Sequence, residues 1–220
     1  MLNFSTSEEN YLKTIFHLQT RDDNVTTNEL AEKLQARPAS ITDMMKKLKT
    51  RKLVNYQPYQ GFRLTPEGKK IALGIIRRHR LWEFFLAEKL KFNWDEVHEV
   101  AEQLEHVSSK KLIDKLDEYL DFPKFDPHGD PIPDTNGKME TGKQISLTEW
   151  QINKPAKICY VANQSPELLE YLHDKKINIG SSILIKRKFS YDDSLEIKLD
   201  NKLLLTMTAQ LAKNIFVKHG

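Results

Sequence analysis

The chain has 220 residues, enough for one large or two small domains, and its 39% hydrophobic content is adequate for a core. The sequence contains no run of about 18 apolar residues, and its N-terminal segment lacks a basic stretch followed by an apolar one. It therefore indicates neither a membrane span nor a signal peptide, and we expect a folded, cytoplasmic protein. The single cysteine, Cys159, excludes an intramolecular disulfide, and its apolar setting predicts a buried strand thiol rather than a ligand.

The net charge of +3 conceals a strong segregation along the sequence. Residues 37–80 contain twelve Lys or Arg and two acidic residues, a net charge of +10, which leaves −7 for the rest of the chain. A surface that is only solvated usually carries positive and negative charges mixed together. Such a basic patch instead favours binding to a polyanion, because cations that neutralise phosphates release counterions from a nucleic acid.

Three helices are predicted at the N-terminus. Apolar residues recur at helical spacing over roughly residues 5–20, and Thr26 and Glu29 have the capping-box spacing of a short second helix. Pro38 suits the first turn of a third helix that runs to about Thr50. The second and third helices together predict a helix-turn-helix. The later of these two helices carries small polar residues in its first half and cationic residues in its second half.

Two short strands around a glycine-bearing loop, residues 57–61, follow the third helix and would supply the wing of a winged helix. The competing interpretation of these two helices is an ordinary small helical hairpin. The predicted wing makes that interpretation less favourable than a winged helix. The residues expected to face DNA are small, polar or basic: Arg37, Pro38, Ala39, Ser40, Thr42, Asp43, Lys46, Lys47, Arg51 and Arg63.

Further helices are predicted from Thr65 and Pro66 to about residue 90, over about 94–107 and over 109–120. Their surplus apolar surface predicts a dimer interface around residues 94–120. A segment rich in Pro and Gly, residues 122–142, predicts a linker. Beyond it, one helix near 166–174 and several strands predict a small β barrel, so the fold class is α+β; the strands are 157–161, 182–189, 195–199, 202–207 and 215–218.

Acid and imidazole side chains recur on two of these helical stretches, namely His79 and Glu83, then His98, Glu102, Glu105 and His106. Offsets of four, seven and eight residues place such groups on one helical face, where oxygen and nitrogen donors could converge on a divalent cation. Any single pair is more typical of a solvated helix surface, but the whole set favours metal binding.

The sequence does not favour catalysis. Di-iron bundles also use helical Glu and His, but their Glu-x-x-His motif is not repeated in these stretches. The sequence has no Gly-rich phosphate loop and no Ser or Cys nucleophile with a local signature, so we expect a protein that is not an enzyme.

Over nearly its full length the chain resembles the diphtheria-toxin-repressor family of metal-dependent transcriptional repressors, including their C-terminal SH3-like domain. Ser40-Ile41-Thr42 resembles the core of the recognition helix. Two further motifs resemble the metal-binding helices: Arg78-His79-Arg80-Leu81 followed by Glu83, and Val97-His98 through Glu105-His106.

This resemblance implies several groups of metal ligands. An ancillary site would consist of His79, Glu83 and His98, and an activating site of Glu102, Glu105 and His106 with Asn10 from the first helix. The Pro-rich connection resembles that of three-domain manganese members and adds Asp126 and His128 as candidates. The SH3-like domain contributes Glu167 as a further candidate carboxylate.

Position 102 discriminates between the branches of the family. Iron-responsive members are known for a cysteine there, whereas the glutamate present here resembles the manganese branch and offers a hard oxygen donor to Mn²⁺. Asn10 departs from both branches, because its amide can ligate but carries no negative charge. Lys13 stands where the manganese branch can have another acid.

We therefore expect a homodimeric, manganese-activated repressor of metal-uptake genes that binds an inverted-repeat operator in duplex DNA. Its domains would be a winged helix at 1–70, a helical dimerisation and metal-binding domain at 71–142 with a linker from 122, and an SH3-like domain at 143–220. One alternative is an iron-dependent (Fe²⁺) or mixed-metal repressor of the same architecture. Another, from a different class, is a metal-independent winged-helix regulator that responds to a small molecule.

Overall fold

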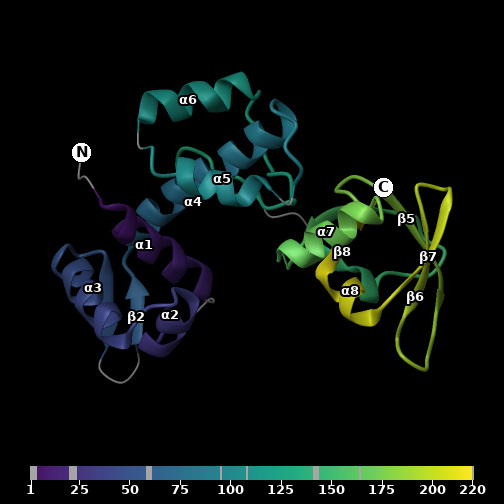
Figure 1. Cartoon of the computed structure of the whole chain (residues 1–220), viewed down its shortest axis with the longest axis horizontal. Helices are drawn as coiled ribbons and strands as arrows, with labels where there is room; N and C mark the ends of the chain where they lie inside the picture. The colour runs from purple at the N-terminus through teal and green to yellow at the C-terminus, as the bar shows by residue number, and fades with distance from the viewer. Residues whose placement is uncertain are drawn as a thin grey trace. The chain divides into compact units, whose positions relative to one another are not determined.

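The computed structural model describes residues 4–19, 24–57, 61–94, 96–107, 109–140, 144–163 and 165–219 (Figure 1). The chain forms two compact units. The first contains residues 1–79, 102–118 and 133–139, and the second contains 80–101, 119–132 and 140–220.

The first unit contains the predicted winged helix-turn-helix (Figure 1). Capping boxes begin its first two helices, where Ser5 pairs with Glu8 and Thr26 with Glu29. Apolar side chains from the helices and the hairpin form one core. The tip of the wing, residues 58–60, lies outside the described residues. The elements are α1 (Thr6–Leu18), α2 (Thr27–Lys33), α3 (Pro38–Thr50), β1 (Val54–Gln57) and β2 (Gly61–Leu64).

Three more helices follow, namely α4 (Pro66–Glu88), α5 (Val97–Leu104) and α6 (Lys110–Tyr119). The last two are shorter than the stretches that the sequence predicts. Trp94 precedes α5 and is buried in the core of the second unit, so it does not belong to an exposed apolar seam. Between residues 94 and 120 the large apolar side chains that are exposed are Val107, Leu112 and Tyr119.

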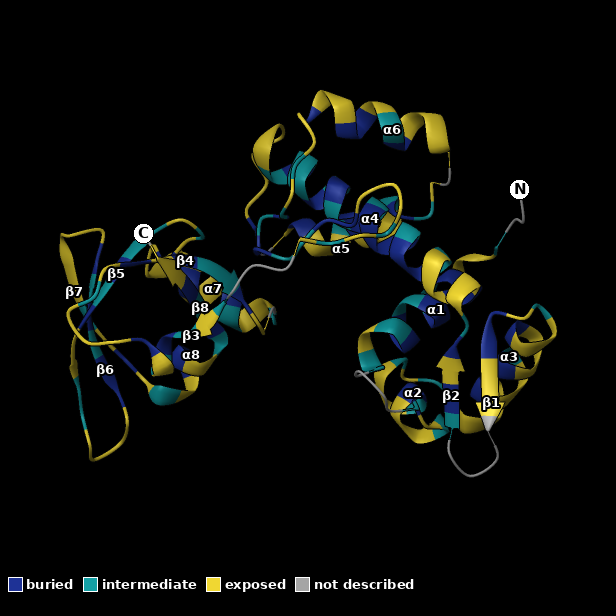
Figure 2. Ribbon diagram, turned by 180° about the vertical axis from the view of Figure 1, so that it is seen from behind, coloured by how far each residue is buried: buried dark blue, intermediate teal, exposed yellow. Residues whose placement is uncertain are grey.

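The second unit contains a six-stranded antiparallel sheet with the order β3-β8-β4-β5-β6-β7. Buried side chains alternate along β6, whereas the edge strand β7 is largely exposed (Figure 2). The predicted helix over residues 166–174 is present as α7 (Pro166–Asp174) and is capped by Ser165. The strands are β3 (Ile145–Ser146), β4 (Ala156–Val161), β5 (Ser182–Lys188), β6 (Leu195–Leu199), β7 (Leu203–Met207) and β8 (Ile215–His219).

The sequence analysis missed three short elements, namely β3, a 3₁₀ turn at Leu147–Glu149 and α8 (Ala209–Asn214). Cys159 lies in a strand as predicted, but it is half-buried rather than buried, and its thiol donates to the Phe216 carbonyl. This partial burial raises the pKa of the thiol. Among the described residues, no helix is both long enough and apolar enough to span a membrane.

Candidate nucleic-acid interface and metal centres

Helix α3 buries one face and exposes the other. Its apolar side consists of Ile41, Met45 and Leu48, and Pro38 occupies its first turn as predicted. The polar side carries the residues predicted to face DNA. Apart from half-buried Arg51, all of these are exposed, including Arg63 on β2: Arg37, Pro38, Ala39, Ser40, Thr42, Asp43, Lys46, Lys47 and Arg63.

Arg51 and Lys47 are tied to Glu8 on α1. The Arg51 guanidinium hydrogen-bonds to Glu8 and lies over the Phe4 ring, and Lys47 Nζ is 3.4 Å from Glu8 Oε1. Burial alone would raise the pKa of Glu8, but the Ser5 backbone N–H and the two cations outweigh it and lower the pKa to about 2. Because Arg51 is held within the protein, it is less suited to a DNA contact than the sequence suggests.

Glu8→Gln is expected to lower the free energy of unfolding by about 1–3 kcal/mol, because a buried charge-assisted hydrogen bond to Arg51 is weakened. The pKa of the folded carboxyl lies below its ordinary value of 4.5, so the difference from wild type should fade as the pH drops from 4.5 toward 2. Chemical denaturation followed by circular dichroism measures both effects. Glu32→Gln, at an exposed position of α2, is the matched control, and an equal loss in both variants would contradict this account.

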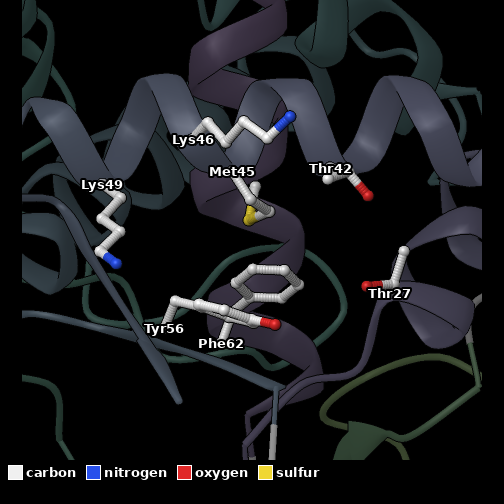
Figure 3. Close-up of a pocket in the computed structure, with 7 residues that line it drawn as sticks. All are labelled: Thr27, Thr42, Met45, Lys46, Lys49, Tyr56 and Phe62. Atoms are coloured by element: carbon white, nitrogen blue, oxygen red, sulfur yellow. The ribbon is translucent and has the colours of Figure 1, made fainter. Parts of the chain in front are cut away.

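A pocket of about 330 Å³ opens beside the polar face of α3 (Figure 3). Met45 points toward the rings of Tyr56 and Phe62, whose centroids are 5.1 Å apart. The pocket therefore combines an apolar floor with ammonium groups, on the side of α3 that carries the predicted DNA contacts. Its lining consists of Thr27, Thr42, Met45, Lys46, Lys49, Tyr56 and Phe62.

The first unit contains a cluster of charged side chains, here called the Glu105 cluster: Glu9, Lys13, His79, Glu102, Glu105 and His106. Glu105 is completely buried, and its two carboxylate oxygens lie 2.7 and 2.8 Å from Lys13 Nζ. His79 Nδ1 is 2.7 Å from the same carboxylate. Burial alone would raise the pKa of Glu105, but His79 and Lys13 outweigh it and lower the pKa. The cluster therefore has an ionised carboxylate at its centre.

Glu9 orients His106 within this cluster. The buried Glu9 carboxylate, which also binds Arg78, lies 2.6 Å from His106 Nδ1. An ionised carboxylate only accepts, so Nδ1 carries the proton and Nε2 carries the lone pair. Nε2 lies 3.6 Å from Glu105 Oε1. An imidazole lone pair beside an ionised carboxylate is a donor pair that fits a divalent cation.

The predicted activating residues are brought together only in part. Glu105 and His106 lie together, whereas the Glu102 side chain is 53% exposed and lies 3.6 Å from Lys13 Nζ. Asn10 is half-buried on α1, and it is the neighbouring Glu9 that reaches His106. The sequence analysis missed Glu9, because an acid in the first turn of a helix is expected to complement the helix dipole. Only its position beside Asn10 could have indicated it.

The second unit contains another cluster, here called the His128 cluster: Arg80, Glu83, His98, Asp126 and His128. Glu83, Asp126 and His128 are all buried, and their possible ligand atoms lie within 4.8 Å of one another. His128 Nε2 is 2.7 Å from the Trp94 carbonyl oxygen, which only accepts, so Nε2 carries the proton. The lone pair is on Nδ1, which is 4.0 Å from Glu83 Oε1 and has no hydrogen-bond partner among the residues that the structure describes. These residues therefore fit a metal ion.

Asp126 lies beside other carboxylates in this cluster. Burial and the carboxylates of Glu83 and Asp130 raise its pKa, and Arg80, 3.5 Å away, only partly offsets them. One Asp126 oxygen accepts the backbone N–H groups of His128 and Asp130 and is fixed by them. A divalent cation would relieve the repulsion between the buried carboxylates.

The loop that carries His128 is held against β4. The Val161 N–H donates to the His128 carbonyl. Gly129 has a φ of +89°, and a Cβ there would lie 2.0 Å from the Cys159 carbonyl oxygen. Only glycine permits both this conformation and this approach, so the loop is positioned by its backbone.

The remaining predicted ligands, His98, His79 and Glu167, are not part of the buried group formed by Glu83, Asp126 and His128. His98 is exposed, and its Nδ1 lies 3.1 Å from Glu83 Oε1. His79 precedes Glu83 by one turn of α4 but belongs to the first unit, so the ancillary set of His79, Glu83 and His98 stays a prediction. Glu167 is exposed in the first turn of α7 and is part of no group of possible ligands found among the described residues.

Three family models match the chain in succession. The N-terminal DNA binding domain of the iron dependent repressors matches residues 3–62. Their metal binding and dimerisation domain matches residues 65–134, and the FeoA domain matches residues 145–219.

Individual relatives agree with these models. The HTH-type transcriptional regulator MntR of Oceanobacillus iheyensis is 31% identical over 151 residues, which cover 69% of this chain and 97% of that protein. The diphtheria toxin repressor of Corynebacterium glutamicum is 30% identical over 133 residues, which cover 60% of this chain but only 58% of that protein. A solved manganese-dependent transcriptional repressor in complex with manganese superposes with a TM-score of 0.85 at 31% identity, covering 96% of this chain and 99% of that one. The chain therefore belongs to the iron-dependent repressor family, together with the diphtheria toxin repressor and MntR.

Proposed function

We propose that the chain is a divalent-metal-activated transcriptional repressor that binds duplex DNA as a homodimer. Its domains would be the winged helix at 1–70, the metal-binding and dimerisation domain at 71–142 and the SH3-like domain at 143–220. The observation that carries the proposal is the junction between α1 and the segment after α5, where Glu9 and Lys13 contact His106 and Glu105. Helix α1 packs in the core of the winged helix. A ligand bound at this junction would therefore act through α1 on the helices that bind DNA.

The Glu105 cluster supplies the activating site in this proposal. Glu105 and His106 would hold the ion, with Glu102 as the adjustable third donor and Asn10 as a fourth candidate. Glu9 keeps the His106 lone pair directed toward Glu105 and so positions it without being a required ligand. When bound, the ion would supply a positive charge shared by groups from both segments and would favour the conformation that joins them.

The His128 cluster supplies a second site. Glu83, Asp126 and His128 would hold the ion there, His98 is a further candidate beside Glu83, and Glu167 is the weakest candidate. The Trp94 carbonyl keeps the Nδ1 lone pair of His128 directed inward, and Gly129 keeps the loop against β4. This arrangement is pre-organised, because its imidazole orientation is fixed by a backbone acceptor.

Manganese is the proposed ion. All candidate ligands are carboxylate or amide oxygens and imidazole nitrogens, and Glu102 adds a hard donor where a thiolate would favour softer ions. The relatives bear names of both kinds, since a solved manganese-dependent transcriptional repressor stands beside the iron-dependent repressor IdeR. Iron (Fe²⁺) therefore remains the alternative ion for the same architecture, and metal-uptake genes are the proposed targets.

We expect the operator to be an inverted repeat, because a twofold dimer presents its two recognition helices symmetrically. Selection of binding sequences from random duplexes, with Mn²⁺ or with chelator, tests the proposed function. Enrichment of an inverted repeat with Mn²⁺ alone is the expected result. Equal enrichment with chelator, or none with any divalent ion, would contradict it.

Lys47→Ala is expected to weaken binding to all duplexes by about three- to tenfold and to reduce the salt slope by about one, because Lys47 would neutralise a phosphate. Its side chain is 56% exposed on the polar face of α3. Fluorescence anisotropy at several salt concentrations measures the change.

Two variants serve as comparisons for Lys47→Ala. Thr42→Ala should instead relax the preference among sequences, because Thr42 lies in the first half of α3, where base edges are read. Lys110→Ala, at a 69% exposed side chain on α6, should change neither property. Binding that is indifferent to salt would mean that the basic segment is only a solvated surface.

The pocket beside α3 is the observation that favours a small-molecule-responsive regulator. Its volume lies at the lower end of the range for ligand sites, and its floor is apolar. Such a regulator would bind DNA in the presence of a chelator, so the same selection separates the two functions.

A further inference from the structure

Lys13 occupies the position in the Glu105 cluster where a cation is needed. Its ammonium lies 2.7 and 2.8 Å from the two oxygens of Glu105 and 3.6 Å from Glu102 Oε1. The Lys13 side chain is only 14% exposed, so these contacts are largely shielded from water. A lysine on α1 therefore bridges the two carboxylates that the proposed activating site would use.

An ammonium and a divalent ion cannot share these oxygens without strong repulsion. Both oxygens of Glu105 accept from Lys13 at hydrogen-bond distance, and a metal ion approaches a carboxylate oxygen even more closely, at about 2 Å. Charge repulsion at such separations is large where water is excluded. The long, flexible side chain of lysine provides a way out, because it can withdraw while α1 stays in place.

We infer that Lys13 is a built-in cation that holds α1 to the Glu105 segment in the absence of metal and that a divalent ion must displace from Glu105. This inference rests on the proposed metal binding by Glu105 and concerns its regulation. Lys13 then performs two opposite tasks. It stabilises the metal-free junction, and it raises the concentration of metal at which the site is filled.

An ordinary buried ion pair is the competing interpretation of the same contacts. A purely structural lysine would contribute to stability, but its removal would leave metal affinity unchanged or lower it through local disorder. A competing cation makes the opposite prediction for affinity, because its removal leaves an anionic site with no charge to displace. The two measurements together distinguish the two roles.

The test is calorimetric titration of Mn²⁺ into the full chain, combined with thermal denaturation in chelator. Lys13→Met should bind Mn²⁺ at least about tenfold more tightly than wild type, because one positive charge is removed a few ångströms from the ion. In chelator the same variant should melt at a lower temperature, because Glu105 loses its buried partner. Adding Glu105→Gln to Lys13→Met should abolish the gain in affinity, which assigns the gain to this cluster.

Two further variants complete the experiment. Lys110→Met removes a charge from an exposed lysine paired with Asp114 and should leave Mn²⁺ affinity within about twofold of wild type. Lys13→Gln is neutral but can still donate to Glu105, so it should show the same gain in affinity should Lys13→Met fail to fold.

The outcomes are separable. Equal or weaker Mn²⁺ binding by both Lys13 variants, in a chain whose wild type binds Mn²⁺, would overturn the inference and leave the proposed function intact. Absence of Mn²⁺ binding in the wild type and in every variant would overturn both. Binding that appears only when Lys13 is removed would support the inference.

Discussion

Glu105→Gln is expected to abolish activation by metal, with a loss of metal affinity at the Glu105 cluster on the order of 100-fold. The substitution removes the ionised carboxylate at the centre of the cluster while nearly preserving its volume. It also leaves Lys13 without its buried counter-charge and weakens the contact with His79. Removing one partner of a buried ion pair costs about 3–5 kcal/mol, so the melting temperature in chelator should fall as well. Titration calorimetry and thermal denaturation measure the two effects.

Glu102→Gln is the matched control for this substitution. Its side chain is 53% exposed and makes a longer contact with Lys13, so the variant should fold with wild-type stability and lose metal affinity to a smaller extent. Wild-type metal dependence in Glu105→Gln would mean that Glu105 is structural and that the activating site lies elsewhere.

His128→Ala is expected to reduce by one the number of tightly bound Mn²⁺ ions per chain, as counted by equilibrium dialysis. The Nδ1 lone pair of His128 is the nitrogen donor of a buried group whose other members are Glu83 and Asp126. Without it, the two carboxylates retain their repulsion but lack a neutral ligand. Ala also leaves a cavity, so the stoichiometry rather than the absolute melting temperature is the decisive measurement.

His173→Ala is the control in the same unit, because His173 is exposed near the end of α7. It should retain the wild-type stoichiometry. An unchanged ion count in His128→Ala would show that the His128 cluster is held together without metal.

Elements with local signals were predictable from the sequence. Helix α3 runs from Pro38 to Thr50 as the first-turn proline and the periodicity predict, and α2 begins with the predicted capping box of Thr26 and Glu29. Helix α7 coincides with the predicted residues 166–174. In each case the information lies within a few residues, and the tertiary structure reinforces it.

Short elements and mutual arrangements were not predictable in this way. A strand of two residues such as β3 exists only because β8 pairs with it, and two residues are too few to show a pattern, whereas β8 itself was predicted. Trp94 belongs to an amphipathic pattern, yet its ring packs in the core of the second unit and stacks on His128. Sequence periodicity defines which side of an element is apolar but not which partner covers it.

In the candidate sites, too, only the features with a local sequence signal were predictable. Spacing predicted that Glu105 and His106 act together, and both lie directly after the end of α5, where His106 Nε2 is 3.6 Å from Glu105 Oε1. The contacts of Glu9 with His106 and of Lys13 with Glu105 join residues 97 and 92 positions apart, and no local pattern encodes them. The orientation of His128 depends on a backbone carbonyl, which any residue at position 94 would provide.

Metal-dependent DNA binding is the central claim, and fluorescence anisotropy with the selected duplex tests it most directly. A labelled duplex is titrated with the full chain in chelator, in Mn²⁺ and in Fe²⁺, with light scattering to follow the dimer. We predict that Mn²⁺ tightens binding by about 10- to 100-fold, that Fe²⁺ is less effective, and that the dimer persists in chelator. Equal affinity in chelator and in saturating Mn²⁺ would contradict the account.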